Sequence, residues 1–225
     1  MDSSIVFPRN ACICIVGLGY VGLPLVLEFS KNHKVIGFDS DCHRIRSLVN
    51  GIDLSGEVDL QEKDVSTNIS FTSKAEEISV ADVYIVAVPT PITSERLPDM
   101  GHLEQACKTV GPLLEEGNGV IFESTVYPGA TEEICIPLLE KYSGLALHAG
   151  FYVGYSPERI NPGDKERTVR DIIKITSGSC PDSAAFIDSL YGEIVDAGTY
   201  SAPSIQVAEA AKVIENIQRL SLIHI

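Results

Sequence analysis

Apolar residues along this chain fall into two alternating patterns. Short unbroken runs rich in valine and isoleucine predict strands that are covered on both faces, and apolar residues at every third or fourth position predict helices. The strand pattern occurs at residues 12–16, 35–39, 69–72, 83–88, 119–123, 152–155, 172–176 and 194–197. The helix pattern occurs at residues 22–30, 41–50, 102–114, 131–142 and 182–191, and again from Pro203 or Ser204 through Arg219.

The order of these elements predicts the fold class. Strands and helices alternate, which is typical of an α/β protein built on an open, doubly wound parallel sheet with helices on both faces. In such sheets, ligands bind at the carboxyl ends of the strands. The start of a long helix follows the sheet.

A glycine-rich turn follows the first predicted strand. Gly17, Gly19 and Gly22 form the spacing Gly-x-Gly-x-x-Gly between a predicted strand and a predicted helix. In a dinucleotide site the first glycine allows a tight turn, the second leaves room for a pyrophosphate, and the third lets the helix pack close to the sheet. The start of the helix offers free N–H groups and its positive dipole end to the phosphates.

Asp39 indicates which dinucleotide is bound. It ends the second predicted strand, about twenty positions after Gly19, as expected for a ribose-binding acid. A carboxylate there accepts hydrogen bonds from both ribose hydroxyls and repels a 2′-phosphate, which favours NAD over NADP. Arg44 is close enough in sequence to weaken that preference. The pattern predicts a Rossmann-like fold with NAD as cofactor; the alternative is an α/β protein that uses the glycine turn only for packing.

Charge and composition argue against several classes of partner and site. The formal net charge of −14 at pH 7 argues against nucleic acid or an anionic membrane as partner, because both would be repelled. No apolar stretch reaches membrane-spanning length, and the N-terminus lacks the features of a signal peptide. The six cysteines show no Cys-x-x-Cys spacing and are expected to be reduced thiols, and the histidines form no ligand-spaced pair, so no metal site is expected. We therefore expect a cytoplasmic protein.

Three further loops carry candidate chemistry. They leave the predicted strands that end at Val88, Glu123 and Tyr155, at the same edge of the sheet as the glycine turn. We therefore expect them to surround the nicotinamide half of a bound NAD. Further along, Lys212 and Asn216 are four residues apart in a predicted helix, so they share one helical face.

Five motifs in this order resemble the UDP-glucose/GDP-mannose dehydrogenase family. They are Gly-x-Gly-Tyr-Val-Gly-Leu, Val-Pro-Thr-Pro, Glu-Ser-Thr-Val-x-Pro-Gly, Pro-Glu-Arg-Ile-x-Pro-Gly and Ala-Glu-Ala-Ala-Lys-x-x-Glu-Asn, within residues 11–219. The resemblance is greatest to the UDP-N-acetylhexosamine branch, above all to UDP-N-acetylglucosamine 6-dehydrogenases of bacterial surface-polysaccharide pathways. Pro162 favours an N-acetylated sugar, because UDP-glucose enzymes tend to carry a second acid there.

The resemblance implies an NAD-dependent oxidation of a UDP-sugar, in which the C6 alcohol becomes an aldehyde and then a carboxylate with the use of two NAD. UDP-N-acetylglucosamine is the expected substrate; UDP-N-acetylmannosamine, UDP-N-acetylgalactosamine and UDP-glucose are the alternatives. By motif, Thr125 would hold a water or the reacting oxygen, Glu158 would act as general base for the hydrolytic step, and Lys212 would stabilise a developing oxyanion. Asn216 would hydrogen-bond in the same pocket.

The cofactor site follows from the glycine motif and the strand-end loops together. It is assigned to Gly17, Gly19, Tyr20, Val21, Gly22, Asp39, Arg44, Pro89, Thr90, Ser124 and Thr125.

Each catalytic assignment has a structural alternative. Thr125 could cap the turn before the next helix, and Glu158 could be a surface acid paired with Arg159. Lys212 and Asn216 could belong to a solvated helix face. From another functional class, the chain could be a non-catalytic NAD-binding module.

The resemblance also implies that part of the enzyme is absent. The family's nucleophile is a cysteine in a second, UDP-binding domain beyond a central helix, and no cysteine here occupies that position. We expect residues 1–200 to form the NAD-binding domain and residues 201–219 to begin the central helix, through which full-length members form homodimers. Residues 220–225 depart from the family and are expected to be a non-native tail. Such a fragment is expected to bind NAD weakly, to catalyse no sugar oxidation and to expose the apolar stripe of its last helix.

Overall fold

The computed structural model describes residues 10–56, 58, 60, 67–159 and 168–223. Within them the chain forms an eight-stranded sheet in the order β3-β2-β1-β4-β5-β6-β7-β8. The strands are β1 (Cys12–Val16), β2 (Lys34–Phe38), β3 (Ile69–Thr72), β4 (Val83–Val86), β5 (Asn118–Phe122), β6 (Phe151–Tyr155), β7 (Lys174–Gly178) and β8 (Thr199–Ser201). The helices are α1 (Gly22–Phe29), α2 (Cys42–Val49), α3 (Gly101–Val110), α4 (Ile136–Ser143), α5 (Pro181–Gly192) and α6 (Ile205–Ile223).

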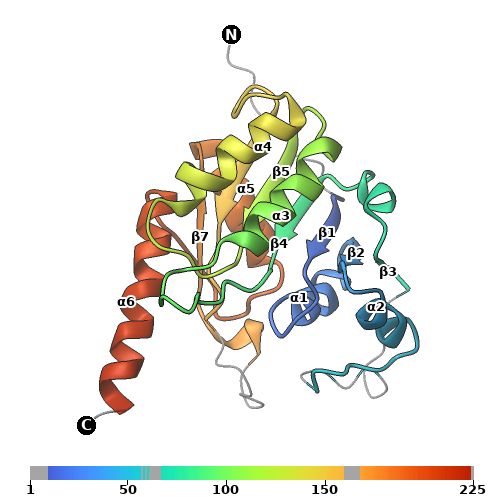
Figure 1. The fold of residues 1–225 in the computed structure, drawn as a ribbon, viewed down its shortest axis with the longest axis horizontal. Helices are drawn as coiled ribbons and strands as arrows, with labels where there is room; N and C mark the ends of the chain where they lie inside the picture. The colour runs from blue at the N-terminus through green and yellow to red at the C-terminus, as the bar shows by residue number, and fades with distance from the viewer. Residues whose placement is uncertain (1–9, 57, 59, 61–66, 160–167, 224–225) are drawn as a thin grey trace.

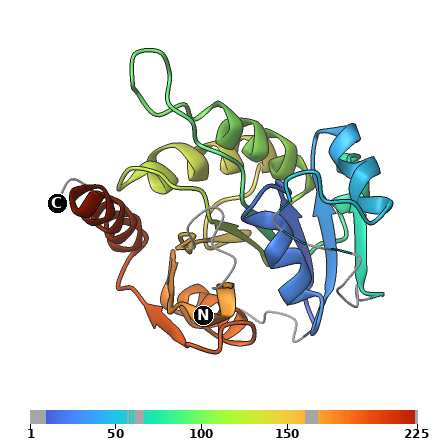
Figure 2. The same cartoon turned by 90° about the horizontal axis from the view of Figure 1, so that it is seen from below.

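Two hydrophobic cores cover the two faces of the sheet. Cys14 and Val16 of β1 face one core, with α3, α4 and the start of α6, and Ile13 and Ile15 face the other, with α1, α2 and α5. This alternation within one strand explains the unbroken apolar runs, because neighbouring side chains point to opposite, equally buried faces. Figure 2 shows α3 and α4 on one side of the sheet and α1 and α5 on the other. The predicted α/β doubly wound fold is confirmed.

The sheet departs from the predicted parallel arrangement at β7. β1 to β6 pair in parallel, whereas β7 runs antiparallel to β6 with Gly154 opposite Gly178. A parallel return needs a crossover connection, usually a helix, and the described part of the connection from β6 to β7 contains only a 3₁₀ turn, Val169–Asp171. β7 therefore begins at the edge where β6 ends.

Three further element predictions differ from the structure. The strand expected at 194–197 is a turn whose Ile194 and Val195 are buried apolar residues, and the last strand is β8. The strand expected at 172–176 lies two residues further on, as β7. The helix expected at 131–142 starts as a π-helical segment, Thr131–Cys135, before α4.

α6 lies beside the ends of β6 and β7 and extends away from the sheet (Figure 1). Its first residues join the core, where Ile205 and Ala208 are buried. Further along, Val207, Ile214 and Ile217 are 45%, 57% and 59% exposed, so the apolar stripe expected on this helix is uncovered.

Candidate functional site

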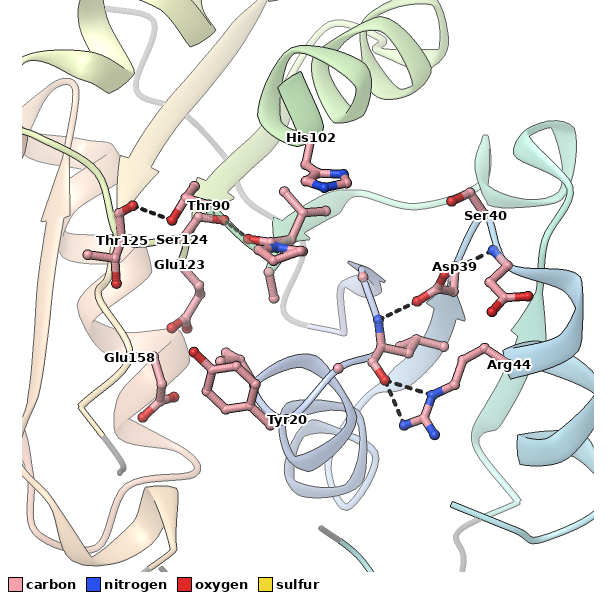
Figure 3. Close-up of a pocket in the computed structure, with 18 residues that line it drawn as sticks. Tyr20, Asp39, Ser40, Arg44, Thr90, His102, Glu123, Ser124, Thr125 and Glu158 are labelled. Atoms are coloured by element: carbon pink, nitrogen blue, oxygen red, sulfur yellow. Dashed lines mark hydrogen bonds between the residues drawn. The ribbon is translucent and has the colours of Figure 1, made fainter. Parts of the chain in front are cut away.

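A cavity of about 520 Å³ lies at the carboxyl ends of β1, β2, β4, β5 and β6. Every residue that the sequence assigns to the cofactor site lines it, except Gly22. Thr125 and Glu158 line it as well. Figure 3 shows Asp39, Ser40 and Arg44 at one end of the cavity and Thr125, Glu123 and Glu158 at the other, with Tyr20 between them.

The three glycines of the turn serve three different needs. Gly17 has φ +94°, and a Cβ there would lie 2.9 Å from the Ala87 carbonyl oxygen. A Cβ on Gly22 would lie 1.8 Å from the Gly17 carbonyl oxygen, so the helix can approach the turn only without a side chain. A Cβ on Gly19 would meet nothing within 4 Å. The structural reasons predicted for Gly17 and Gly22 are confirmed, and Gly19 leaves open space on the cavity wall.

Asp39 sits at the tip of β2 and is held by the main chain. Its Oδ2 accepts a hydrogen bond from the Leu18 N–H at 2.9 Å, and its Oδ1 accepts one from the Asp41 N–H at 3.0 Å. The carboxylate is thereby fixed beside the glycine turn and still lines the cavity. A fixed acceptor at this position suits the hydroxyls of a ribose.

Arg44 braces the turn from the outside. Its Nε and Nη2 donate to the Leu18 carbonyl at 3.0 and 2.7 Å, and its Nη1 donates to Asp53 at 2.5 Å. Burial acts to raise the pKa of Asp53, but hydrogen bonds from Ser55 and Arg44 hold that pKa below its ordinary value. A guanidinium bound in this way is less able to turn toward a 2′-phosphate. Arg44 is therefore less able to weaken the preference for NAD over NADP than its position in the sequence indicates.

Hydrogen bonds join the loops that follow β4 and β5. Ser124 Oγ donates to the Val88 carbonyl, and Thr90 Oγ1 donates to the Thr125 carbonyl, both at 2.6 Å. The Thr125 hydroxyl itself makes no hydrogen bond to any residue that the structure describes. It therefore does not cap the turn before the next helix, and it lines the cavity as an available polar group.

Glu158 is buried at the end of β6 rather than exposed. Its Oε1 accepts a hydrogen bond from the Arg159 N–H at 2.6 Å, whereas the Arg159 guanidinium pairs with Glu215 of α6 at 3.2 Å. The alternative of a surface ion pair between Glu158 and Arg159 is therefore wrong. The motif continues into Asn161-Pro162-Gly163, which lies outside the described residues.

Lys212 approaches the same loop from α6. It is buried, and its Nζ donates to the Glu158 carbonyl oxygen. Burial lowers the pKa of Lys212, against the opposing attraction of Glu215 and Glu158. Asn216 is half-buried one turn further along the helix. The solvated-face alternative is wrong for Lys212, although neither Lys212 nor Asn216 lines the cavity.

A buried cluster that reaches the cavity wall through Glu123 was not predicted from the sequence. Glu123, which directly follows β5, accepts hydrogen bonds at 2.5 Å from Lys174 Nζ and from the Tyr191 hydroxyl. Burial raises the pKa of Glu123, and the Lys174 charge is the largest influence opposing that rise. The only sign of this cluster in the sequence was an acid, Glu123, at the end of one predicted strand and a cation, Lys174, within another.

Glu209 is a second buried acid whose role could not be predicted from the sequence. It is fully buried on α6, and its carboxylate accepts from the Gly129 N–H at 2.6 Å and from the N–H and hydroxyl of Thr131 at 3.0 and 2.7 Å. These donors lie where the loop after β5 becomes a helix. An acid between alanines on a helix face was the signal that could have located it.

Three polar residues also line the cavity without having been predicted: Ser40, Asp41 and His102. Asp41 caps α2 by accepting from the His43 N–H at 2.7 Å. His102 lies in the first turn of α3, across the cavity from Tyr20 (Figure 3).

The described part of the chain was also searched for metal-binding clusters, disulfides and membrane-spanning helices. No group of three or more histidine, cysteine or acidic residues there could hold a metal ion. All six cysteines are described, and all are free thiols. No described helix is long and apolar enough to cross a membrane.

Comparison with known proteins agrees with this geometry. Residues 11–195 match the model of the UDP-glucose/GDP-mannose dehydrogenase family, NAD binding domain. The chain is 55% identical over 211 residues to a UDP-N-acetyl-D-glucosamine 6-dehydrogenase of Pseudomonas aeruginosa, and 53% identical over 207 residues to that of Salmonella typhi. The matches cover 94% and 92% of this chain, and 50% and 49% of the relatives.

A solved structure of a nucleotide-sugar dehydrogenase is also similar to this chain. The UDP-D-ManNAc dehydrogenase from Pyrococcus horikoshii superposes with a TM-score of 0.85 at 31% identity, over 92% of this chain and 50% of that one. This chain thus spans about half the length of the relatives it matches. The family match over residues 11–195, on a chain with a glycine turn after β1 and a parallel sheet covered on both faces, shows that the chain belongs to the UDP-glucose/GDP-mannose dehydrogenase family and carries its NAD-binding domain.

Proposed function

We propose that this chain is the NAD-binding half of a nucleotide-sugar 6-dehydrogenase that oxidises the C6 alcohol of UDP-N-acetylglucosamine to the uronate. The 55% identity to the Pseudomonas aeruginosa UDP-N-acetyl-D-glucosamine 6-dehydrogenase favours this sugar over N-acetylmannosamine, since the UDP-D-ManNAc dehydrogenase is 31% identical. UDP-N-acetylgalactosamine and UDP-glucose are further candidate substrates for the same chemistry.

The observation that carries the proposal is the composition of one cavity. The ribose-binding acid Asp39 and the glycine turn line one end, and Thr125 and Glu158 line the other. With its adenosine at Asp39 and its pyrophosphate at Gly19, a dinucleotide has its nicotinamide beside Thr125 and Glu158. A substrate carbon at that end would then be within reach of both the coenzyme and the candidate base.

The residues divide the chemistry between them. Bound NAD supplies the hydride acceptor in each of two oxidation steps. The Thr125 hydroxyl holds the reacting oxygen or a water, and the Glu158 carboxylate takes the proton of the water in the hydrolytic step. Lys212 stabilises the oxyanion that develops, and Asn216 hydrogen-bonds in the same region. The contact of Lys212 with the Glu158 main chain supports its closeness to the reacting groups.

This chain by itself is proposed to bind NAD without oxidising the sugar. The family resemblance implies a cysteine nucleophile, and none of the six cysteines lines the cavity. Both Cys14 and Cys135 are buried in the core. Burial raises the pKa of the Cys14 thiol well above its ordinary range, and a hydrogen bond with Cys107 together with burial does the same for Cys135. A buried, protonated thiol is a poor nucleophile.

A chimera tests the proposal. Residues 11–219 are joined to the half of the Pseudomonas aeruginosa enzyme that this chain does not span. We expect this chimera to form two NADH per UDP-N-acetylglucosamine, measured at 340 nm, and the 225-residue chain to form none. Glu158→Gln in the chimera should abolish uronate formation while NAD still binds. A folded, NAD-binding chimera that oxidises none of the four UDP-sugars would refute the proposed activity.

A further inference from the structure

The cavity is electrically asymmetric at the end away from Asp39. Glu123 and Glu158 both line it there, and no lysine or arginine does so among the described residues (Figure 3). Lys174 of β7 pairs with Glu123, and Lys212 of α6 donates to the Glu158 main-chain carbonyl, but neither ammonium group lines the cavity. A group bound in the cavity therefore meets the carboxylates before the ammonium groups.

Glu123 is the more firmly fixed of the two acids. It is 1% exposed, and Lys174 Nζ and the Tyr191 hydroxyl each lie 2.5 Å from one of its oxygens. The ammonium charge and both hydrogen bonds favour the ionised carboxylate, against the effect of burial. Lys174 also donates to the Pro157 carbonyl at 3.2 Å and lies 3.9 Å from Glu158. The cluster ties together the ends of β5 and β6, the start of β7 and α5, so Glu123 has no freedom to turn away.

We propose that Glu123, held by Lys174 and Tyr191, is a specificity-determining residue that makes the cavity favour the oxidised, positively charged nicotinamide over the neutral reduced ring. The inference rests on the proposed placement of the nicotinamide at this end of the cavity. It assigns to Glu123 a role separate from that of the candidate base Glu158.

The physical reason is the difference in charge between the two forms of the coenzyme. NAD and NADH share adenosine, pyrophosphate and both riboses, and differ by a positive charge on the nicotinamide ring. A carboxylate within several ångströms, shielded from water, interacts with that charge and hardly with the neutral ring. Because the ammonium groups lie further back, they cancel only part of the attraction. Preference for the oxidised form suits an enzyme that must bind it twice per sugar.

The test compares ligands that differ only at the nicotinamide. Dissociation constants of NAD, NADH and ADP-ribose, which lacks the ring, are measured by calorimetry for the 225-residue chain and for Glu123→Gln. Glutamine keeps the size and can still accept hydrogen bonds. We expect the ratio of the NADH to the NAD dissociation constant to fall about tenfold (about 1.4 kcal/mol). Binding of ADP-ribose should change by less than about twofold.

Two further variants separate charge from structure. Tyr191→Phe removes a hydrogen bond to Glu123 but keeps the carboxylate, so the ratio should remain that of the wild type. Lys174→Met leaves Glu123 buried without its cation, which favours the neutral acid, so the ratio should fall as in Glu123→Gln. Circular dichroism and melting temperature establish that each variant is folded.

The outcomes are distinguishable. An unchanged ratio in folded Glu123→Gln, with both coenzymes weakened equally, would mean that Glu123 has only a structural role, and the inference would be overturned. The inference would also be overturned if wild-type protein binds ADP-ribose but neither it nor any variant distinguishes NAD from NADH. That result would leave the dinucleotide site intact. If wild-type protein binds none of the three ligands, the proposed function fails first and this inference with it.

Discussion

Gly19 and Gly22 lie three residues apart in one turn, yet a methyl group at each has a different consequence. At Gly22 the turn leaves no room for a Cβ, because the Gly17 carbonyl oxygen occupies that position. At Gly19 the Cβ would project into open space on the cavity wall. The fold therefore requires a glycine at position 22 but not at position 19, where we propose that the ligand requires it.

This contrast predicts opposite phenotypes for two alanine variants. Gly22→Ala should lower the free energy of unfolding by about 3 kcal/mol or more, because backbone must move to relieve the overlap. Gly19→Ala should melt within a few degrees of wild type and bind NAD at least about tenfold more weakly, because its methyl group meets the pyrophosphate. Thermal unfolding and calorimetry measure both. A Gly19→Ala protein with wild-type affinity would show that the pyrophosphate does not pass over this residue.

Asp53 provides a test at acid pH. Its folded-state pKa is lowered by Ser55 and Arg44, so its contribution to stability is present above the unfolded-state pKa of about 3.9. That contribution is lost as pH falls through the lower folded-state pKa. We expect Asp53→Asn to be less stable than wild type at pH 7 and the difference to shrink below about pH 4, in urea unfolding.

The exposed acid Asp182 gives the control for that experiment. Asp182→Asn removes the same charge at a position without an arginine partner among the described residues. A stability difference for Asp53→Asn that stays constant between pH 7 and pH 3 would show that its pairing with Arg44 is not the source of its effect.

At the scale of elements, α6 holds both loops of the candidate site. Glu209 caps the helix that follows the loop with Thr125, and Lys212, Glu215 and Arg219 contact the loop with Glu158 and Arg159. Hydrogen-bonded acids and cations along one helix thus fix two strand-end loops relative to each other. Tertiary contacts of this kind are invisible in the local pattern of the sequence.

Removal of the Glu209 carboxylate should loosen this arrangement. Glu209→Ala leaves the N–H groups of Gly129 and Thr131 buried without an acceptor, and we expect a loss of about 3 kcal/mol in the free energy of unfolding. Glu132→Ala, at an exposed position in the same helical segment, should cost less than about 1 kcal/mol. Equal effects of the two substitutions in denaturant unfolding would contradict a capping role for Glu209.

β7 shows where prediction from the sequence failed and why. Strand positions from β1 to β6 followed from apolar runs, because burial on both faces is a local property of composition. The direction of β7 depends on how the chain returns from β6, which no local pattern encodes. A parallel β7 would place Lys174 at the far edge of the sheet, whereas the antiparallel strand starts beside Glu123. The missed direction therefore hid the buried cluster.

Site residues could be predicted where a motif carries its own chemistry. The glycine turn and Asp39 were identified because their residue types and spacing imply a ligand. The loop with Thr125 was identified from its position after a predicted strand and from the family resemblance, and residues of all three line the cavity. Glu123, Lys174 and Tyr191 come from three separate elements, and only the folded sheet brings them together. Their pairing depends on tertiary geometry, so spacing along the chain carries no sign of it.

At the scale of the whole molecule, an apolar stripe on α6 is uncovered. Val207, Ile214 and Ile217 are each more than two-fifths exposed, and contiguous apolar surface of this kind favours association. Family resemblance implies that full-length members pair through this helix. We expect the purified chain to self-associate through the same stripe.

Sedimentation velocity over a range of concentrations measures this association. The wild-type chain should shift toward a dimer as its concentration rises, and Ile214→Lys with Ile217→Lys should remain monomeric with an unchanged melting temperature. Val49, which is exposed on α2, provides a matched control as Val49→Lys. A wild-type chain that is monomeric at all concentrations would refute self-association through α6.

The central claim is that one cavity binds NAD, with its adenosine ribose at Asp39 and its nicotinamide at Thr125. Calorimetric titration of the folded chain tests it most directly, with NAD and NADP compared for wild type and Asp39→Asn. We predict one NAD per chain, weaker binding of NADP, and at least about tenfold weaker NAD binding after the substitution, which removes a charged acceptor. Absence of heat and of any rise in melting temperature with NAD, in folded wild-type protein, would contradict the account.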